Sequence, residues 1–403
     1  MKKFIFIVLV ALLNSCKIET PCGCVAPPNA KLIGISAKFA AQNSTFAFDY
    51  FRKVNEKEVN NNVILSPLSL DIALGMLLNG ANSKTADEIK TALRKEGFST
   101  DELNQTYQKL MQGLPKVDNS VTVNIANSVW LNDQYTLETN FTDNLKNFFL
   151  AQTYPFSMLK KDEAKTNINQ WASDKTQGKV PTIIDDVPND AFLFLLNAVY
   201  FKGNWKYQFN ASETKDSPFY LTSEKTKTVK LMKQTNLYRV TQGNNYAAFE
   251  LPYANGDFNM TIILPDRTEA IDKFIQTFDY ATWKTLQSNL KEQKEEIAIP
   301  KFELSYDADL NETLKALGMK TAFTNQADLS KITTKVGLYV SKVKQKVYIK
   351  ADEVGTEAAG VTSIGIGLTS VPLRNYICDR PFILVISEKS SDTILFTGKI
   401  ANP

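Results

Sequence analysis

The chain contains no histidine among its 403 residues. Ser-His-Asp and Cys-His nucleophilic sites and HExxH zinc sites need that side chain, so the sequence excludes these hydrolase mechanisms. Paired carboxylates, Ser-Lys pairs and cofactor chemistry stay open in principle. No glycine-rich loop has the P-loop or dinucleotide-binding pattern, so a phosphate site has no support. We expect no enzyme, no cofactor and no metal site.

A different chemistry is indicated by residues 355–371. Every second residue from Thr356 to Leu368 is small or apolar, and none of these is charged. No proline occurs from Gly355 to Val371, so each residue can donate a backbone hydrogen bond. This alternation favours a strand with one inner face, which an ordinary flexible loop would not need. The inner set is Thr356, Ala358, Gly360, Thr362, Ile364, Ile366 and Leu368.

Composition indicates a soluble globular protein, with 43% hydrophobic and 22% charged residues. The net charge of +3, from 46 basic and 43 acidic residues, gives little support for nucleic-acid binding. Separately, we expect the protein to be a monomer. The densest basic stretch is Lys342, Lys344, Lys346 and Lys350. Spacing by two places the first three on one face of a strand, which is either a solvated face or a polyanion site.

The N-terminus has the pattern of a targeting segment. Lys2 and Lys3 precede an apolar run at residues 4–13, which has signal-peptide length and is too short to span a bilayer. The following box, which ends at Cys16, resembles a bacterial lipoprotein cleavage site, although Asn14 departs from the usual residue. We expect a signal peptide over residues 1–15 and a lipidated Cys16; the alternative is ordinary signal cleavage. The protein would then sit in a bacterial envelope, on the outer membrane facing the periplasm or the surface, or be secreted.

The remaining cysteines do not form a disulfide framework. Cys22 and Cys24 are too close for an easy mutual bridge and lie beside Pro27 and Pro28, in a linker that we place at residues 16–35. Cys378 lies between apolar residues, so we expect a buried thiol.

Residues 36–403 are expected to form one domain of mixed α+β class. Helical spacing occurs at residues 72–77 and 86–93, and a short helix is expected at residues 311–319, ending at Gly318. Apolar, β-rich runs are not separated by regular helices, which argues against repeated βαβ units. The expected strands lie at residues 121–130, 192–200, 260–264, 297–304, 382–386 and 394–396.

Several stretches, in order along the chain, resemble the serpin family. They are NVILSPLS at residues 62–69, NIANSVW at 124–130, INQW at 168–171, TQGKV at 176–180, NAVYFKGNW at 197–205, ELPY at 250–253, IPKF at 299–302, DRPF at 379–382 and FTGKIANP at 396–403. The resemblance implies a single domain with a large central mixed β-sheet, further sheets, surrounding helices and an exposed reactive-centre loop at about residues 353–374.

The segment at residues 353–362 resembles the hinge of inhibitory serpins, with a mild departure at Val354. The resemblance implies that the loop, once cut, inserts as a new strand in the middle of a sheet. The uncharged inner face of this segment fits that mechanism. The hinge residues are Glu353, Gly355, Thr356, Ala358, Ala359 and Gly360.

The resemblance also places the bond that a target protease cuts, between Thr369 and Ser370. A small β-branched residue before the bond suggests an elastase-like target. Cleavage after Leu368 would instead suit a chymotrypsin-like enzyme, and cysteine proteases are a further option. Arg374 could attract a trypsin-like enzyme, but a cut there would lengthen the inserted segment and spoil trapping.

By the same resemblance, Ser66, Ser69 and Asn197 lie under the point where the sheet opens. A histidine is common beside them in the family; the matching residue here is Gln345, which can donate and accept hydrogen bonds but has no acid switch. Trp205 would lie near the top of the opening sheet, either as a gate or as a core residue.

The first hypothesis is therefore a suicide-substrate inhibitor of serine endopeptidases, with cysteine endopeptidases as a further option. The second is a non-inhibitory serpin that acts as an envelope binding protein, against which the uncharged hinge argues. The third is a lipoprotein enzyme that works without histidine.

Overall fold

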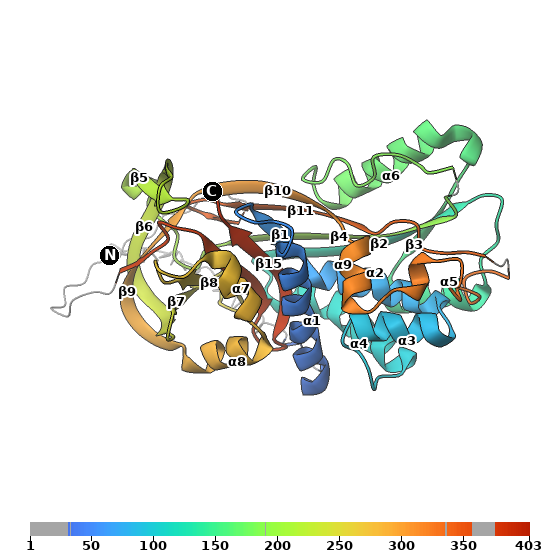
Figure 1. The fold of residues 1–403 in the computed structure, drawn as a ribbon, viewed down its shortest axis with the longest axis horizontal. Helices are drawn as coiled ribbons and strands as arrows, with labels where there is room; N and C mark the ends of the chain where they lie inside the picture. The colour runs from blue at the N-terminus through green and yellow to red at the C-terminus, as the bar shows by residue number, and fades with distance from the viewer. Residues whose placement is uncertain (1–30, 33, 190, 335–336, 357–374) are drawn as a thin grey trace, which may run out of the picture.

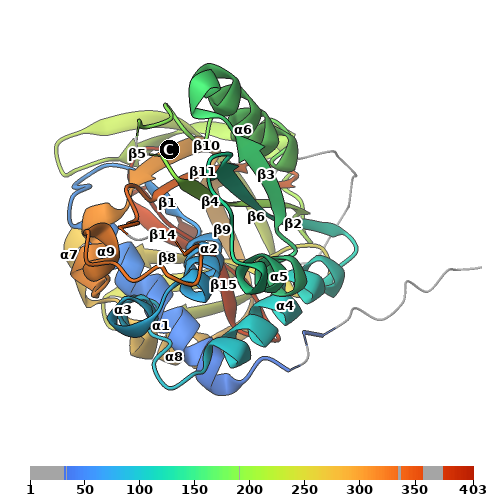
Figure 2. The ribbon, with the colours of Figure 1, turned by 90° about the vertical axis from the view of Figure 1, so that its right-hand side faces the viewer.

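The computed structural model describes residues 31–32, 34–189, 191–334, 337–356 and 375–403. Long strands run through the centre of the molecule; α6 covers one face of them, and α2, α4 and α5 lie on the opposite side (Figures 1 and 2). The helices are α1 (Ala37–Asn55), α2 (Pro67–Gly80), α3 (Ser83–Ala92), α4 (Thr100–Val117), α5 (Thr139–Phe149), α6 (Lys161–Lys175), α7 (Ile271–Thr277), α8 (Tyr280–Asn289) and α9 (Asn311–Leu317).

Short 3-10 turns lie at Met158–Lys160, Ala211–Glu213 and Thr321–Phe323. The strands are β1 (Val63–Leu65), β2 (Val121–Asn132), β3 (Gln152–Phe156), β4 (Leu193–Asn204), β5 (Lys215–Tyr220), β6 (Thr226–Gln242), β7 (Tyr246–Pro252), β8 (Phe258–Pro265), β9 (Lys291–Pro300), β10 (Phe302–Asp309), β11 (Lys344–Ala351), β12 (Gly355–Thr356), β13 (Asn375–Ile377), β14 (Phe382–Glu388) and β15 (Thr393–Ile400). The mixed α+β class is confirmed.

Local sequence explains where the site-bearing helix α2 begins. The Ser66 hydroxyl accepts a hydrogen bond from the Ser69 N–H, and Pro67 takes the first helical position, where no N–H is needed. The short helix α9 ends at Gly318, whose φ of 121° suits glycine. The helices expected from residues 72–77, 86–93 and 311–319 are therefore confirmed.

The strands form three groups among the described residues. The largest sheet has the order β1-β15-β14-β8-β7-β6-β9-β13, with β5 paired to β6. A second sheet has the order β12-β4-β2-β3, and β10 and β11 form an antiparallel pair of their own. In the second sheet, β2 and β4 pair antiparallel over most of their length, which places Asn127 opposite Asn197.

Two apolar clusters cover the two faces of the β2–β4 pair. The main core contains Val123 and Phe201 together with residues of α1, α2 and α4. A separate cluster joins Trp130 and Ala198 to Ile168 and other residues of α6 and of the segment that follows it. Helix α6 is therefore held on the sheet by its own small core.

Two expectations about strands were wrong in detail. The run at residues 297–304 is divided between β9 and β10, which belong to different sheets. Pro300 cannot donate a ladder hydrogen bond, and the next amide, Lys301, donates to the Lys230 carbonyl instead. Strand β11 begins at Lys344, so Lys342 lies before the strand rather than on its face.

Candidate functional site: a slot between β4 and β11

Strands β4 and β11 face each other across a gap. No strand pairing joins them in the part of the chain that the structure describes. At one end of the gap lies β12, which pairs antiparallel with β4 through Gly355 opposite Asn204 and Thr356 opposite Gly203. Since β12 follows β11 after a turn, the chain has already begun a new strand at this end of the slot.

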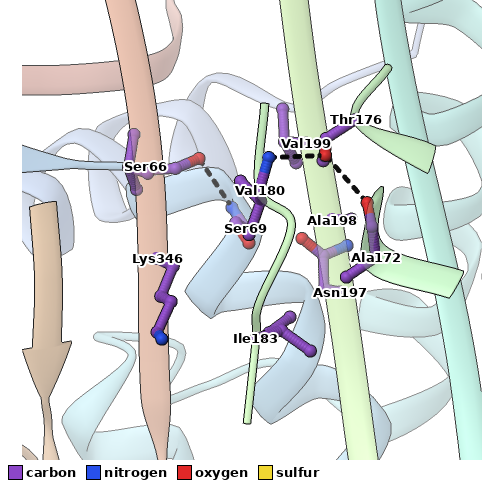
Figure 3. A pocket seen from close by; sticks show the side chains of 11 residues that line it. Ser66, Ser69, Ala172, Thr176, Val180, Ile183, Asn197, Ala198, Val199 and Lys346 are labelled. Carbon is purple, nitrogen blue, oxygen red and sulfur yellow. Dashed lines mark hydrogen bonds between the residues drawn. The ribbon is translucent and has the colours of Figure 1, made fainter. Parts of the chain in front are cut away.

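Two hollows continue along the slot beyond β12. The first has an empty volume of about 310 Å³, open solvent included, and lies among Ser66 and Ser69 at the start of α2, Asn197 on β4 and Lys346 on β11 (Figure 3). The second, of about 330 Å³, reaches Thr356. Thr176, Val180 and Val199 line both hollows.

The slot also has a cover. Figure 3 shows the chain that carries Val180 and Ile183 running lengthwise between β11 and β4. We call residues 176–187, which follow α6, the cover segment. Thr176 and Val180 of this segment line both hollows of the slot.

The turn before β12 is closely bonded. The Asp352 carboxylate accepts hydrogen bonds from the amides of Val354 and Gly355, at 3.0 and 3.3 Å. The Asp352 N–H in turn donates to the Gly355 carbonyl at 3.0 Å. A Cβ added at Gly355 would lie 2.2 Å from the Gly203 carbonyl oxygen, so only glycine permits this close pairing.

Thr356 is buried, and its hydroxyl lies 2.7 Å from the Tyr253 hydroxyl. Burial raises the pKa of Tyr253 well above the ordinary tyrosine value, so the phenol stays neutral and able to donate. The first inward-facing residue of the hinge therefore has a polar partner in the core.

Glu353 is anchored by two side chains. Its carboxylate accepts from Lys301 at 2.7 Å and from Thr214 at 2.9 Å. Burial raises the pKa of Glu353, but the bonds from Lys301 and Thr214 outweigh burial and the net pKa is lowered. The carboxylate therefore stays ionised at neutral pH.

Trp205 is tied to the same turn. Its indole N–H donates to the Asp352 carbonyl at 2.9 Å, and its backbone N–H donates to the Val354 carbonyl at 2.8 Å. Its ring stacks on Tyr253 with centroids 4.6 Å apart. Trp205 is thus a buried residue that also touches the start of the loop.

The floor of the slot is a hydrogen-bonded group centred on Gln345. Its side-chain oxygen accepts from the Ser66 N–H at 2.9 Å and from the Tyr50 hydroxyl at 3.1 Å. Its side-chain NH₂ donates to the Ser66 carbonyl at 2.8 Å. Asn197 donates from β4 to the Asn127 side-chain oxygen at 2.7 Å. The structure thus brings Ser66, Ser69 and Asn197 to one hollow, with Gln345 bonded to Ser66.

The lysine stretch is neutralised rather than free. Lys344 and Lys346 form ion pairs with Asp185 and Asp307, and Lys342 lies 3.7 Å from Asp309. A polyanion site at these lysines gains no support from this arrangement.

The family is decided by comparison with known proteins. The model of the family described as "Serpin (serine protease inhibitor)" matches residues 41–403. The chain belongs to the serpin family. Serpins are described as protease inhibitors rather than as enzymes, and the fold of this serpin is the family's mixed α+β fold.

Relatives and solved structures agree with this assignment. The serpin is 31% identical to leukocyte elastase inhibitor of Sus scrofa, over 91% of this chain and 100% of the relative. It is 30% identical to Serpin B4 of Homo sapiens, over 90% and 98%. Among solved structures, human thyroxine-binding globulin matches with a TM-score of 0.83 at 27% identity, over 91% and 98%. The thermophilic serpin Tengpin in its native state matches with a TM-score of 0.83 at 28% identity, over 92% and 95%.

Several expected residues lie outside the described residues of this serpin: Cys16, Ala358, Ala359, Gly360, Leu368, Thr369 and Ser370. Cys378 is a buried free thiol, as expected, and burial raises its pKa far above the usual range. Within the described ranges, no group of acidic or cysteine side chains could hold a metal ion. No helix in those ranges is long and apolar enough to cross a membrane.

Sequence reasoning missed the partners of the hinge. Tyr253 and Lys301 lie in the motifs ELPY and IPKF, which indicated the family but no role. Their bonds to Thr356 and Glu353 join residues 103 and 52 positions apart, so no local pattern could have revealed them.

Proposed function

We propose that this serpin inhibits proteases as a suicide substrate. A target protease attacks the loop at Thr369, forms an acyl-enzyme there and releases the chain that begins at Ser370. The loop then inserts into the slot before water completes hydrolysis, and the protease is carried along and distorted. The observation that supports this proposal best is β12, which already occupies the first two positions beside β4.

The register of β12 extends this observation. Each further residue of the loop would pair with one residue earlier in β4, so Leu193, where β4 begins, would meet Ile366. An inserted strand in this register ends just before Thr369, which is consistent with the proposed cut. From Thr356 to Thr369 the strand would span about 45 Å.

The side chains fit the same register. In an antiparallel pair, residues opposite each other point to one face, so Ala358 would share a face with Phe201 and Gly360 with Val199. Phe201 belongs to the main core, and the partly buried Val199 packs against that core. The uncharged alternate set of the loop therefore meets the core, and Glu357 falls on the other face.

The driving force resides in the uncut protein. Beyond β12, no strand of the described residues joins β4 to β11, so a loop that inserts there after the cut would gain backbone hydrogen bonds and buried apolar surface. Protection against this change is kinetic, because the uncut loop is tethered at both ends.

The experiment is to mix the protein lacking residues 1–16 with an elastase-like and a chymotrypsin-like serine protease. Denaturing gels and mass spectrometry then identify the products. The proposal predicts an SDS-stable covalent complex and a released peptide that begins at Ser370 with the elastase-like enzyme, or at Thr369 if the bond after Leu368 is used. Cleavage without any complex would contradict it. A papain-like cysteine protease extends the test to the second enzyme class.

A binding protein is the second candidate. It is favoured by the likeness to thyroxine-binding globulin, whose solved structure is a complex with thyroxine. The same mixing experiment separates the two, because a binding serpin would be cut or ignored but would form no covalent complex.

We also propose that the protein is anchored in a bacterial envelope through lipid on Cys16. The pattern of residues 1–16 supports this. Membrane fractionation after labelling with a fatty acid tests the proposal: the wild type should carry label and Cys16→Ser should not. Equal labelling of both proteins would exclude this anchor.

A further inference from the structure

At residues 183–184 the cover segment is bonded to α6 through the Asn169 side chain. Asn169 of α6 accepts hydrogen bonds from the amides of Ile183 and Ile184, at 2.7 and 3.0 Å. Its NH₂ group donates to the Ile184 carbonyl at 3.0 Å. Helix α6 and residues 183–184 are therefore held together at this point.

The cover segment is also attached to both edges of the slot. On the β4 side, the Tyr200 hydroxyl donates to the Gln177 side-chain oxygen at 3.0 Å. On the β11 side, the Lys179 ammonium lies 5.0 Å from the centre of the Tyr348 ring. On the same side, the Asp185 carboxylate forms ion pairs with lysines of β11.

Asp185 binds two lysines of β11 at once. Its carboxylate lies 2.5 Å from the Lys344 ammonium and 3.2 Å from that of Lys346. Hydrogen bonds from Lys344 and Lys346 lower the pKa of Asp185 to about 2. The same two lysines contact Asp307 of β10, at 3.3 and 3.0 Å. Asp307 belongs to the strand pair itself, so among these carboxylates only Asp185 connects the lysines to the cover segment.

Insertion of a strand must disturb this arrangement. A strand between β4 and β11 sets their axes two strand spacings apart, about 9.6 Å. The cover segment contacts residues of both strands, so any separation of β4 from β11 during insertion would break contacts at one of the two edges. The side chain of Asp185 is 54% exposed, so water and salt reach its ion pairs and screen them.

We propose that Asp185 is a positioning residue that clasps the cover segment to β11 and thereby slows opening of the slot. The clasp acts through Lys344 and Lys346. This inference rests on the proposed function, because it names what controls strand insertion, but its first test needs no protease.

The first test is hydrogen–deuterium exchange of the uncut protein, read on peptides that cover residues 176–187. It compares the wild type with Asp185→Asn at low ionic strength and at about 0.5 M NaCl, where charge interactions are screened. Asp186→Asn is the matched control, since it removes the same charge from a neighbour with no ion pair among the described residues. Asp307→Asn is the second control. It removes one ion-pair partner of Lys344 and Lys346 but leaves their contact with the cover segment in place.

At low ionic strength, Asp185→Asn should raise exchange in this segment roughly two- to fivefold, the range expected for an exposed ion pair. Salt should speed exchange in the wild type and in both controls but leave Asp185→Asn unchanged. Equal exchange in Asp185→Asn and Asp186→Asn at low salt would overturn the clasp.

The second test is the partition between trapped and merely cut protein with an inhibited protease. Asp185→Asn should shift this partition toward trapping by a similar factor, and Asp186→Asn should not. If Asp185→Asn and Asp186→Asn partition alike, the clasp does not control insertion. If the wild type forms no complex with any protease, the proposed function fails, and the exchange experiment still decides whether the clasp exists.

Discussion

The hydroxyl oxygens of Tyr253 and Thr356 lie 2.7 Å apart, which joins the residue directly after β7 of the largest sheet to the first inward-facing residue of the loop. Both side chains are buried, with relative exposures of 0% and 4%. The beginning of the loop is therefore already part of the protein interior before any cut.

Replacing Thr356 by arginine should turn the inhibitor into a substrate. The guanidinium would have to enter a buried site that offers one phenol as a partner, at a large desolvation cost. Incubation with an inhibited protease, read on denaturing gels, should give cut chain and no covalent complex. Thr356→Ser, which keeps the hydroxyl, should still trap. Trapping by the arginine variant at the wild-type level would show that the hinge does not insert as described.

Removing the Tyr253 hydroxyl should lower the free energy of unfolding by about 1 kcal/mol, the net worth of a buried hydrogen bond. Tyr253→Phe keeps the ring that stacks on Trp205. Tyr238→Phe is the control, because the Tyr238 hydroxyl is buried without a hydrogen-bond partner in the described residues and its loss should be neutral or stabilising. Urea unfolding of both variants measures the difference; an equal effect in the two would remove the assigned role of the Tyr253–Thr356 bond.

A histidine in place of Gln345 should make the stability of the protein sensitive to acid at the floor of the slot. Neutral imidazole can accept from Ser66 and donate on its other side, whereas imidazolium presents only donors to the Ser66 and Tyr50 groups that now donate to Gln345. The folded-state pKa of the new histidine would thus be lowered, so stability is lost as pH falls below about 6.5, the unfolded value. The melting temperature of Gln345→His should drop relative to wild type between pH 7.5 and 5.5. A parallel response of the two proteins would contradict this account.

The ion pairs of Asp185 should contribute to stability only above acidic pH. Its pKa is lowered to about 2 in the folded protein by Lys344 and Lys346, against an ordinary value of 3.8. A lowered carboxyl pKa stabilises the fold fully above the unfolded value, and this contribution is lost as pH falls from about 4 to about 2. In urea unfolding, the deficit of Asp185→Asn relative to Asp186→Asn should be present at pH 6 and smaller at pH 3. A deficit that does not change with pH would mean that charge is not its cause.

The sequence predicted the parts of this fold that have a local pattern. Apolar periodicity located α2 and α9, and apolar runs located β2, β4, β8, β14 and β15. The long strand β6 was not predicted, because its residues are mostly polar and one face is exposed. Family resemblance, rather than periodicity, supplied Ser66, Asn197 and Gln345.

The remainder depends on contacts between distant positions. Asp185 and Lys344 are 159 residues apart in the chain, and nothing local in either stretch indicates the other. That β4 and β11 belong to different sheets likewise depends on strand pairing. The residue pattern of each strand alone does not reveal it. The cut at Thr369–Ser370 lies outside the described residues and stays a prediction.

The most direct test of the central claim, insertion of the cut loop between β4 and β11, is the thermal stability of the cut protein. A metalloprotease is suitable because it forms no acyl-enzyme and so releases the cut chain, and mass spectrometry can verify a cut within residues 366–371. A strand paired along most of β4 adds on the order of ten backbone hydrogen bonds at about 1 kcal/mol each, so the melting temperature should rise by roughly 10–20 °C. An unchanged or lower melting temperature after complete cleavage at this position would contradict insertion, and with it the proposed mechanism.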